Sequence, residues 1–314
     1  MEEEQNEQKH EEHHEHNEVS KQKKSFAEWY EKNYKLLLII PLILILFGII
    51  YQINFYNQYG DIIRKDISLT GGTSVTIYQN FDTSNLISDL SGKLNEVDVK
   101  IIYNIITGEN KAVIIETKSD SETTKKVLEE YIGYELTDEN SSFEFSGSTL
   151  SEGFYKQLVI AIIFAFLLMA IVVFVIFRTF APSTAVIISA FADIFMTLVT
   201  VNVLGMKISS AGIVAFLMLI GYSVDTDILL TTRMLKRKDD KLNERIIGAI
   251  KTGLTMTLTS LFAVLAALFI IKSFSPVLSQ IFIIISIGLT FDIFNTYVTN
   301  ISLLKWYMEK KGLK

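Results

Sequence analysis

The sequence predicts a multi-pass α-helical membrane protein with six transmembrane helices and one α+β domain outside the membrane. Two observations carry this prediction: six long apolar runs, and a segment of mixed strand-like and helix-like pattern between the first two of them. The composition agrees, because the 314 residues are 49% hydrophobic and only 20% charged, with a mean hydropathy of +0.33. A run of about 18 residues with few charges can cross a hydrocarbon core of roughly 30 Å as a helix.

The first apolar run, Leu36 to Ile53, contains Pro41 but no charge. It lies too far from the N-terminus and is too long for a secretory signal, so we expect an uncleaved anchor. The other runs span approximately Gln157–Phe177, Ser183–Leu204, Ile208–Leu230, Lys251–Ile271 and Pro276–Leu304. The expected division is a disordered tail at 1–34, a first transmembrane helix at 35–56, a domain at 57–150, transmembrane helices two to six at 151–307, and a C-terminus at 308–314.

The short loops predict the orientation. Cytoplasmic loops of membrane proteins carry an excess of Lys and Arg. The loop between the fourth and fifth runs holds Arg233, Lys236, Arg237, Lys238, Lys241 and Arg245, whereas the opposite turns hold one Lys each, Lys207 and Lys272. We therefore expect both termini in the cytoplasm, the helices in the plasma membrane in contact with its lipids, and the domain at 57–150 outside the cell.

The segment at 57–150 alternates strand-like and helix-like stretches. Strands are expected at Thr73–Gln79, Val97–Ile106, Lys111–Thr117 and Ser142–Phe145, and helices at Thr83–Leu94 and Thr123–Ile132. The order βαββαβ is that of a ferredoxin-like split βαβ unit. No paired carboxylates or nucleophile stand in a catalytic setting, so we expect a small binding or steric domain.

The composition also excludes several kinds of site. No Cys is present, which removes disulfides, thiol catalysis and thiolate metal sites. All four His lie within the first 16 residues, so a His-centred hydrolase or metalloenzyme is excluded. This Glu-rich and His-rich tail could bind a metal weakly, but its composition favours a solvated, disordered extension. We expect no catalytic residue, no metal, no cofactor and no nucleic-acid partner.

Five ionisable residues fall inside the predicted spans. A charged side chain at the bilayer centre costs about 2.5 to 3.5 kcal/mol on insertion scales, so each needs a physical reason. They are Asp193 in the third segment, Asp225 and Asp227 in the fourth, Lys251 in the fifth and Asp292 in the sixth. A proton or cation relay would explain them, and so would polar pairs that only fix helix packing.

Polar residues accompany these charges along single helix faces. The fifth segment carries Gly248, Lys251, Thr252, Thr255 and Thr259, and the sixth carries Gly288, Asp292, Asn295, Thr296 and Thr299. Such faces contact other helices or a hydrated cavity, because lipid cannot satisfy them. On an ideal helix Asp225 and Asp227 point about 200° apart, so they cannot both face one partner. Either could pair with Lys251.

Four stretches resemble the SecD/SecF family, in the form found in archaea. GYSVDTDILLTTR begins at Gly221, Tyr222 and Ser223 and is similar to the family's fourth-helix signature. DISLTGGTSVTI contains the pair Gly71 and Gly72 and is similar to its element after the first helix. Asp193 matches its acidic position in the third helix, and GLTFDIFNTYVTNISLLKWY is similar to its last helix. The resemblance covers nearly the whole chain beyond the first residues of the tail.

The resemblance implies a half-unit of the RND superfamily that pairs with a SecD-like subunit beside a SecY-type channel. It implies assistance to polypeptides crossing the membrane, coupled to the proton gradient, and no enzymatic activity. Two positions depart from the bacterial pattern. The family's Asp falls at Thr226 here, flanked by Asp225 and Asp227, and its fifth-helix Arg corresponds to Lys251, followed by Thr252. A Lys can lose its proton in a buried site and an Arg effectively cannot.

Two other functions stay open at this stage. One is a proton-driven small-molecule transporter of the RND type, although such pumps are two fused halves with larger outer domains. The other is a structural stabiliser of the translocation channel, in which the buried charges act only as links between helices.

Overall fold

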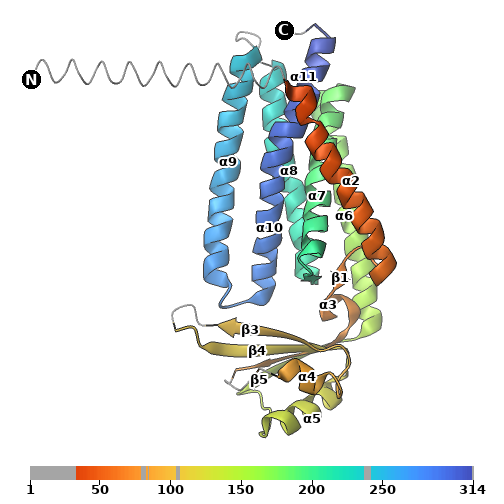
Figure 1. The fold of residues 1–314 in the computed structure, drawn as a ribbon, viewed down its shortest axis with the longest axis vertical. Helices are drawn as coiled ribbons and strands as arrows, with labels where there is room; N and C mark the ends of the chain where they lie inside the picture. The colour runs from red at the N-terminus through yellow and green to blue at the C-terminus, as the bar shows by residue number, and fades with distance from the viewer. Residues whose placement is uncertain (1–32, 79–82, 84, 104–106, 237–241, 313–314) are drawn as a thin grey trace, which may run out of the picture.

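The computed structural model describes residues 33–78, 83, 85–103, 107–236 and 242–312. Long helices form a bundle, and a small sheet domain lies at one end of it (Figure 1). Six helices in the described part are long and apolar enough to span a membrane, which confirms the predicted multi-pass class. The predicted tail at 1–34 lies almost entirely outside the described residues.

The first spanning helix precedes the sheet domain, and the others follow it with short connections. They are α2 (Ile39–Tyr59), α6 (Ser148–Phe177), α7 (Phe180–Val203), α8 (Ser210–Lys236), α9 (Leu242–Ile271) and α10 (Pro276–Asn295). The last continues through a π-helix, η1 (Thr296–Asn300), into α11 (Ile301–Lys310). Ser275 caps α10 by accepting a hydrogen bond from the Leu278 amide, and Pro276 occupies its first turn, where a missing N–H costs nothing.

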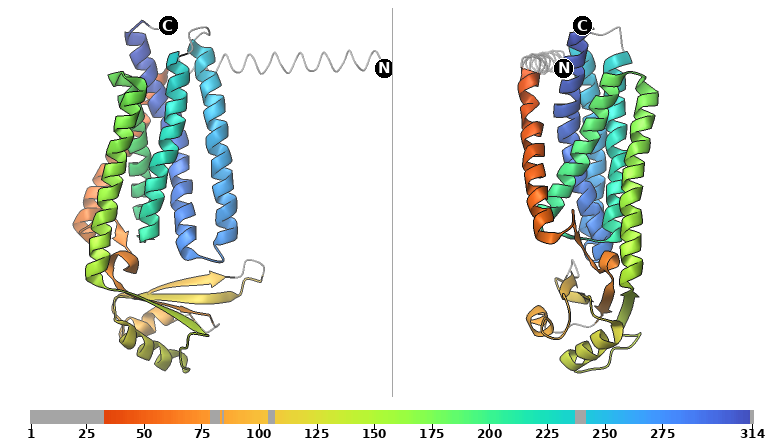
Figure 2. Two further views of the ribbon diagram at one scale, coloured as in Figure 1. Left: turned by 180° about the vertical axis from the view of Figure 1, so that it is seen from behind. Right: turned by 90° about the vertical axis from the view of Figure 1, so that its right-hand side faces the viewer.

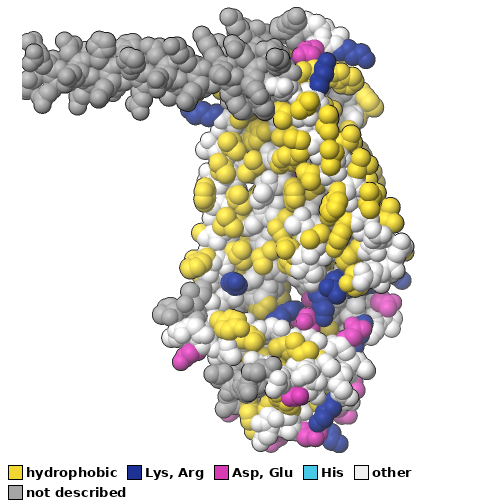
Figure 3. Space-filling model, in the orientation of Figure 1, with side chains coloured by type: hydrophobic (Ala, Val, Ile, Leu, Met, Phe, Trp, Pro, Cys, Tyr) yellow, Lys and Arg dark blue, Asp and Glu magenta, His cyan; other side chains and the backbone are white. Residues whose placement is uncertain are grey.

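Three helices form the centre of the bundle. α10 packs against α7, α8 and α9, while α7 and α8 also pack against each other. α2, α6 and α9 bury few of their side chains, and α2 packs chiefly against α7 at the edge of the bundle (Figure 2). Hydrophobic side chains cover the bundle surface between two ends where charged side chains gather (Figure 3). This distribution suits a bundle surrounded by lipid.

The sheet domain has four antiparallel strands. In chain order its elements are β2 (Gly72–Ile77), α4 (Leu86–Leu90), β3 (Asp98–Tyr103), β4 (Asn110–Thr117), α5 (Ser121–Ile132) and β5 (Ser141–Ser146). The strand order is β3-β4-β2-β5. Val75, Ile115 and Leu128 belong to the core between sheet and helices. The helices cover the face away from the bundle, so the other face looks toward it (Figure 1).

Helix α4 is shorter than the sequence predicts. The apolar spacing predicts a helix from Thr83 to Leu94, whereas the helix occupies only Leu86–Leu90 and a turn follows. Gly92 lies in this turn, and Gly is a poor helix former because ordering its backbone costs the most entropy. Leu94 still reaches the core from the turn.

A compact joint connects the sheet domain to the bundle. β1 (Arg64–Lys65) pairs in parallel with β6 (Lys207–Ile208), and the short α3 (Ile67–Thr70) follows. Asp66 caps α3 by accepting from the Ser68 amide at 2.9 Å, and Ser68 Oγ accepts from the Ser210 amide at the start of α8, also at 2.9 Å. Lys207 forms an ion pair of 3.2 Å with Asp98 of β3.

The predicted pair Gly71 and Gly72 lies at this joint. Their φ angles are +84° and +143°, a region that side-chain-bearing residues rarely adopt. A Cβ on Gly71 would lie 2.5 Å from Ser148 Cα, and one on Gly72 would lie 2.3 Å from the Thr117 carbonyl oxygen. Glycine is therefore required here both for the turn and for close contact, of Gly71 with α6 and of Gly72 with β4.

A partly buried ion pair lies on the sheet face toward the bundle. Lys100 Nζ of β3 lies 2.6 Å from Glu116 Oε1 of β4, whereas Glu116 Oε2 is buried without a hydrogen-bond partner. Burial raises the pKa of Glu116 above 4.5, and the charge of Lys100 opposes the rise only in part. The pKa of Glu116 is higher in the folded protein than in the unfolded chain. The contribution of Glu116 to stability is therefore largest in acid, and it declines as the pH rises from the pKa of the unfolded chain to the pKa of the folded protein.

We expect Lys100→Met to destabilise the sheet domain by about 1–3 kcal/mol at neutral pH, because it leaves a buried carboxylate without a counter-charge. The loss should shrink in acid, where Glu116 is neutral. Glu116→Gln, which removes the charge, should cost less at neutral pH. Limited proteolysis of the sheet domain at the two pH values measures both effects. Equal losses in both variants, independent of pH, would contradict this account.

Candidate functional site

Three of the five intramembrane charges meet at the centre of the bundle. They are Asp193 of α7, Asp227 of α8 and Asp292 of α10, and each is fully buried. We call these three residues the carboxylate site. Asp193 and Asp227 lie on helices that the sequence places next to each other, but their contact with Asp292 depends on how α10 packs between α7 and α8.

Asp193 accepts hydrogen bonds on both of its oxygens. Ser223 Oγ of α8 donates to Oδ2 at 2.5 Å, and Asn295 Nδ2 of α10 donates to Oδ1 at 2.7 Å. Asn295 is also held by Thr299, whose hydroxyl donates to Asn295 Oδ1 at 3.1 Å. Asp193 therefore ties three central helices together.

Asp227 accepts on one oxygen only. Asn300 Nδ2 donates to Oδ1 at 2.7 Å, and Thr296 Oγ1 lies 3.0 Å from the same atom. Asp227 Oδ2 is buried without a hydrogen-bond partner, and so is Asn300 Oδ1. Ser189 of α7 lies close to Asp227, but its hydroxyl does not reach hydrogen-bonding geometry.

Asp292 has only long contacts with hydroxyl groups. Thr257 Oγ1 of α9 lies 3.4 Å from Oδ2, and Thr296 Oγ1 lies 3.3 Å from Oδ1. A hydroxyl has one proton, so Thr296 can donate to Asp227 or to Asp292 but not to both. Thr296 is therefore a shared contact between the two carboxyl groups.

The polar stripe predicted on the sixth segment lies at this site, with one addition. Asn295, Thr296 and Thr299 were part of the stripe, whereas Asn300 was not. In an α-helix, residues 295 and 300 lie about 140° apart, so sequence spacing separates them. The π-helix η1 bonds each residue to the one five positions away and so brings Asn295 and Asn300 to one side.

The two remaining charges lie outside the carboxylate site. Asp225 and Lys251 are both exposed on the surface of this chain. The opposite directions of Asp225 and Asp227 agree with their spacing on a helix. Among the described residues, Lys251 forms no ion pair with either aspartate. The pairing that the sequence left open is therefore absent within the chain itself.

The other residues of the fourth-segment signature divide between the interior and the surface. Ser223 is buried against Asp193, whereas Gly221 and Tyr222 are exposed near Asp225. Thr252, next to Lys251, accepts a hydrogen bond of 2.6 Å from Arg233 and so links α9 to α8.

The carboxylate site has the chemistry of a proton-binding group. Among the described residues, no Lys or Arg forms an ion pair with any of the three carboxyl groups. Burying several uncompensated negative charges in a medium of low polarity is costly, and taking up protons removes the charge. The side chains around Asp193 and Asp227 donate hydrogen bonds to the carboxyl oxygens through amide N–H and hydroxyl groups. A metal ion bound to these oxygens would have to displace the donors.

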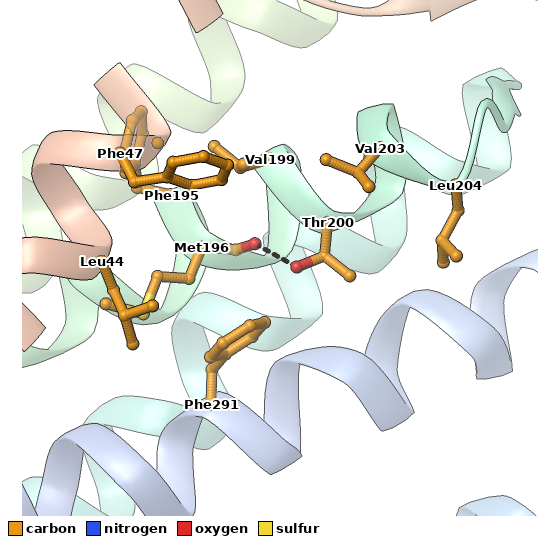
Figure 4. A pocket seen from close by; sticks show the side chains of 10 residues that line it. Leu44, Phe47, Phe195, Met196, Val199, Thr200, Val203, Leu204 and Phe291 are labelled. Atoms are coloured by element: carbon orange, nitrogen blue, oxygen red, sulfur yellow. Dashed lines mark hydrogen bonds between the residues drawn. The ribbon is translucent and has the colours of Figure 1, made fainter. Parts of the chain in front are cut away.

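A separate cavity lies between α2, α7 and α10. It has a volume of about 260 Å³ and is lined by apolar side chains, among them Phe47, Phe195 and Phe291 (Figure 4). Its one hydroxyl, of Thr200, donates to the Met196 carbonyl oxygen at 2.8 Å. No ionisable side chain lines this cavity, so it has no part in the chemistry of the carboxylate site.

Comparison with known proteins assigns the family. A sequence model described as "Protein export membrane protein SecD/SecF, C-terminal" matches residues 125–310. The SecF protein of Methanocaldococcus jannaschii is 39% identical over 290 residues, which cover 90% of this chain and 99% of the relative. The SecF protein of Methanothermobacter thermautotrophicus is 38% identical and covers 90% and 95%. The chain belongs to the SecF family of protein-export membrane proteins.

A solved structure supports the fold. The crystal structure of SecDF from Thermus thermophilus, described as a translocon-associated membrane protein, matches with a TM-score of 0.67 at 20% identity. The match covers 88% of this chain and 38% of the SecDF chain. The resemblance seen in the sequence is thus confirmed, and with it a general role of the SecF family member in protein export. The relatives of this chain are named for protein export and not for an enzymatic reaction, in line with the predicted lack of enzymatic activity.

Proposed function

We propose that this SecF-family chain and a SecD-like subunit form a complex that uses the proton gradient to assist polypeptides crossing the plasma membrane beside a SecY-type channel. The observation that carries the proposal is the carboxylate site, where Asp193, Asp227 and Asp292 meet on the three central helices without a cationic partner among the described residues. In the proposed orientation both termini are cytoplasmic and the sheet domain lies outside the cell. The joint at Gly71 and Gly72 is the route by which helix movement would reach this domain.

We further propose that the exposed charges contact the SecD-like subunit. Asp225 and Tyr222 of α8, and Lys251 and Thr255 of α9, are exposed although they lie within membrane spans. Exposed to lipid, such groups would be costly. A second helical half with complementary polar groups would cover them, and α8 and α9 are neighbours, so they can share one partner. Lys251 would then find its carboxylate on the other subunit.

The test is co-purification with the SecD-like subunit in mild detergent. Lys251→Glu should reduce the retained partner at least tenfold, because an unpaired charge of the wrong sign at a dry interface costs several kcal/mol. Lys272→Glu makes the same change in the turn after α9, outside the membrane, and should retain the partner. Wild-type retention by Lys251→Glu would refute the proposed contact.

One observation favours a second function, stabilisation of the channel without ion flow. Both Asp193 and Asp227 join neighbouring helices through side-chain amides, which is how purely structural polar links are built. The relatives reported above are named for protein export, so the small-molecule transporter gains no support from them.

A further inference from the structure

We propose that Asp227 and Asn300 form a cyclic acid–amide pair that holds one proton, and that the π-helix places Asn300 where this pair can form. The inference rests on the proposed function, because it names the proton-binding unit within the carboxylate site. It assigns Asn300 a role as the residue that positions the proton on Asp227.

The unpaired atoms of the two residues complement each other. Asp227 Oδ1 and Asn300 Nδ2 already share a hydrogen bond of 2.7 Å. The remaining atoms, Asp227 Oδ2 and Asn300 Oδ1, are both buried and both lack a partner. Two acceptors cannot bond each other, but a proton on Oδ2 turns it into a donor. One proton therefore satisfies both buried atoms and closes a ring of two hydrogen bonds.

The other carboxyl groups do not offer this arrangement. Both oxygens of Asp193 already accept from donors, and the oxygen of its amide partner Asn295 already accepts from Thr299, so a proton on Asp193 would find no unpaired acceptor on that amide. Asp292 contacts only hydroxyl groups, at 3.3 and 3.4 Å. Among the described residues of the site, only Asp227 is bonded to a group that also presents a buried, unpaired acceptor.

The backbone supports the assignment. The π-helix adds one residue to a turn, which is unfavourable in itself and is found frequently at functional sites. Here its first and last residues, Thr296 and Asn300, both bond Asp227 Oδ1, while Asn295 just before it bonds Asp193. An uninterrupted α-helix would turn Asn300 away from the face that Asn295 occupies.

The groups that face Asp227 favour a proton over a metal ion. Its ionisable neighbours are Asp193 of α7, Asp292 of α10 and Tyr297 of the π-helix. Asn300 directs an N–H donor at Asp227, and a metal ion would have to displace it. Uptake is a simple transfer in which hydronium gives its proton to Oδ2 and leaves as water. Release reverses the transfer and leaves Asp227 Oδ2 and Asn300 Oδ1 as two unpaired acceptors, so that only the hydrogen bond from Asn300 Nδ2 to Asp227 Oδ1 still joins the pair.

Infrared spectroscopy of the purified complex tests the pair directly, because a protonated carboxyl group has its own C=O stretching band. Wild-type protein should show such a band, and the difference spectrum between wild type and Asp227→Asn should isolate the part that belongs to Asp227. Asn300→Leu should shift it to higher frequency, because the carboxyl group loses both hydrogen bonds to the amide. Asn295→Leu is the matched control, since it removes the amide that serves Asp193 and should leave the Asp227 band in place.

Three results would overturn the proposal: no carboxyl band in the difference between wild type and Asp227→Asn, a difference band unmoved by Asn300→Leu, or a shift produced by Ser189→Ala instead. If Asn300→Leu does not fold, the same test can be made on wild-type protein that contains isotope-labelled asparagine. In a pH titration of that protein, one side-chain amide band must change together with the carboxyl band. If export does not depend on the proton gradient although the carboxyl band changes as described, only the proposed function is refuted. Gradient-driven export without the band would refute only the pair.

Discussion

Asp227→Asn should abolish gradient-dependent export while the complex with the SecD-like subunit stays assembled. The amide has nearly the shape of the carboxyl group and can still bond Asn300, but it cannot carry a proton at this position. The measurement is translocation into membrane vesicles with and without a proton gradient. Export should fall to the level seen without the gradient.

Asp225→Asn is the matched control, because Asp225 lies two residues away on the same helix and is exposed. It should keep the response to the gradient as long as the partner is retained. If Asp227→Asn exported normally with an intact complex, the relay would be refuted. If its export failed only because the complex dissociated, the carboxylate site would be a structural link between helices.

Gly72→Ala should destabilise the joint between the sheet domain and the bundle by about 2 to 6 kcal/mol. A non-glycine residue at φ +143° is strained, and the new Cβ would lie 2.3 Å from the Thr117 carbonyl oxygen, which is backbone and cannot turn away. Hydrogen exchange in β2 and limited proteolysis of the sheet domain measure the loss. Export should fall with it if the domain transmits helix movement.

Gly133→Ala provides the comparison. Gly133 also has a positive φ, +80°, and ends α5 in the same domain, but a Cβ there meets nothing within 4 Å. It should cost only the backbone strain, about 1 kcal/mol. Equal protease sensitivity in the two variants would show that the close contact with Thr117 does not matter.

The sequence predicted much of the fold because apolar length and periodicity are local properties. The runs beginning at Leu36 and Pro276 are long enough to be recognised by composition alone, and each falls within a spanning helix. Strands such as β2 carry an alternating pattern that their own residues define. The shortened helix α4 was missed because a turn containing Gly92 competes with an apolar pattern that continues to Leu94.

The sequence by itself determined the membrane class, the family and which charges fall within the long apolar runs, since each follows from composition or from matched motifs. Only the tertiary structure decided that Asp193, Asp227 and Asp292 meet, that Asp225 and Lys251 remain exposed, and that Asn300 joins the site. Helical periodicity shows which residues share a face but not which neighbouring helix that face meets. The π-helix adds a second reason, because a shift in backbone hydrogen bonding rotates every later residue relative to the spacing that a regular helix predicts.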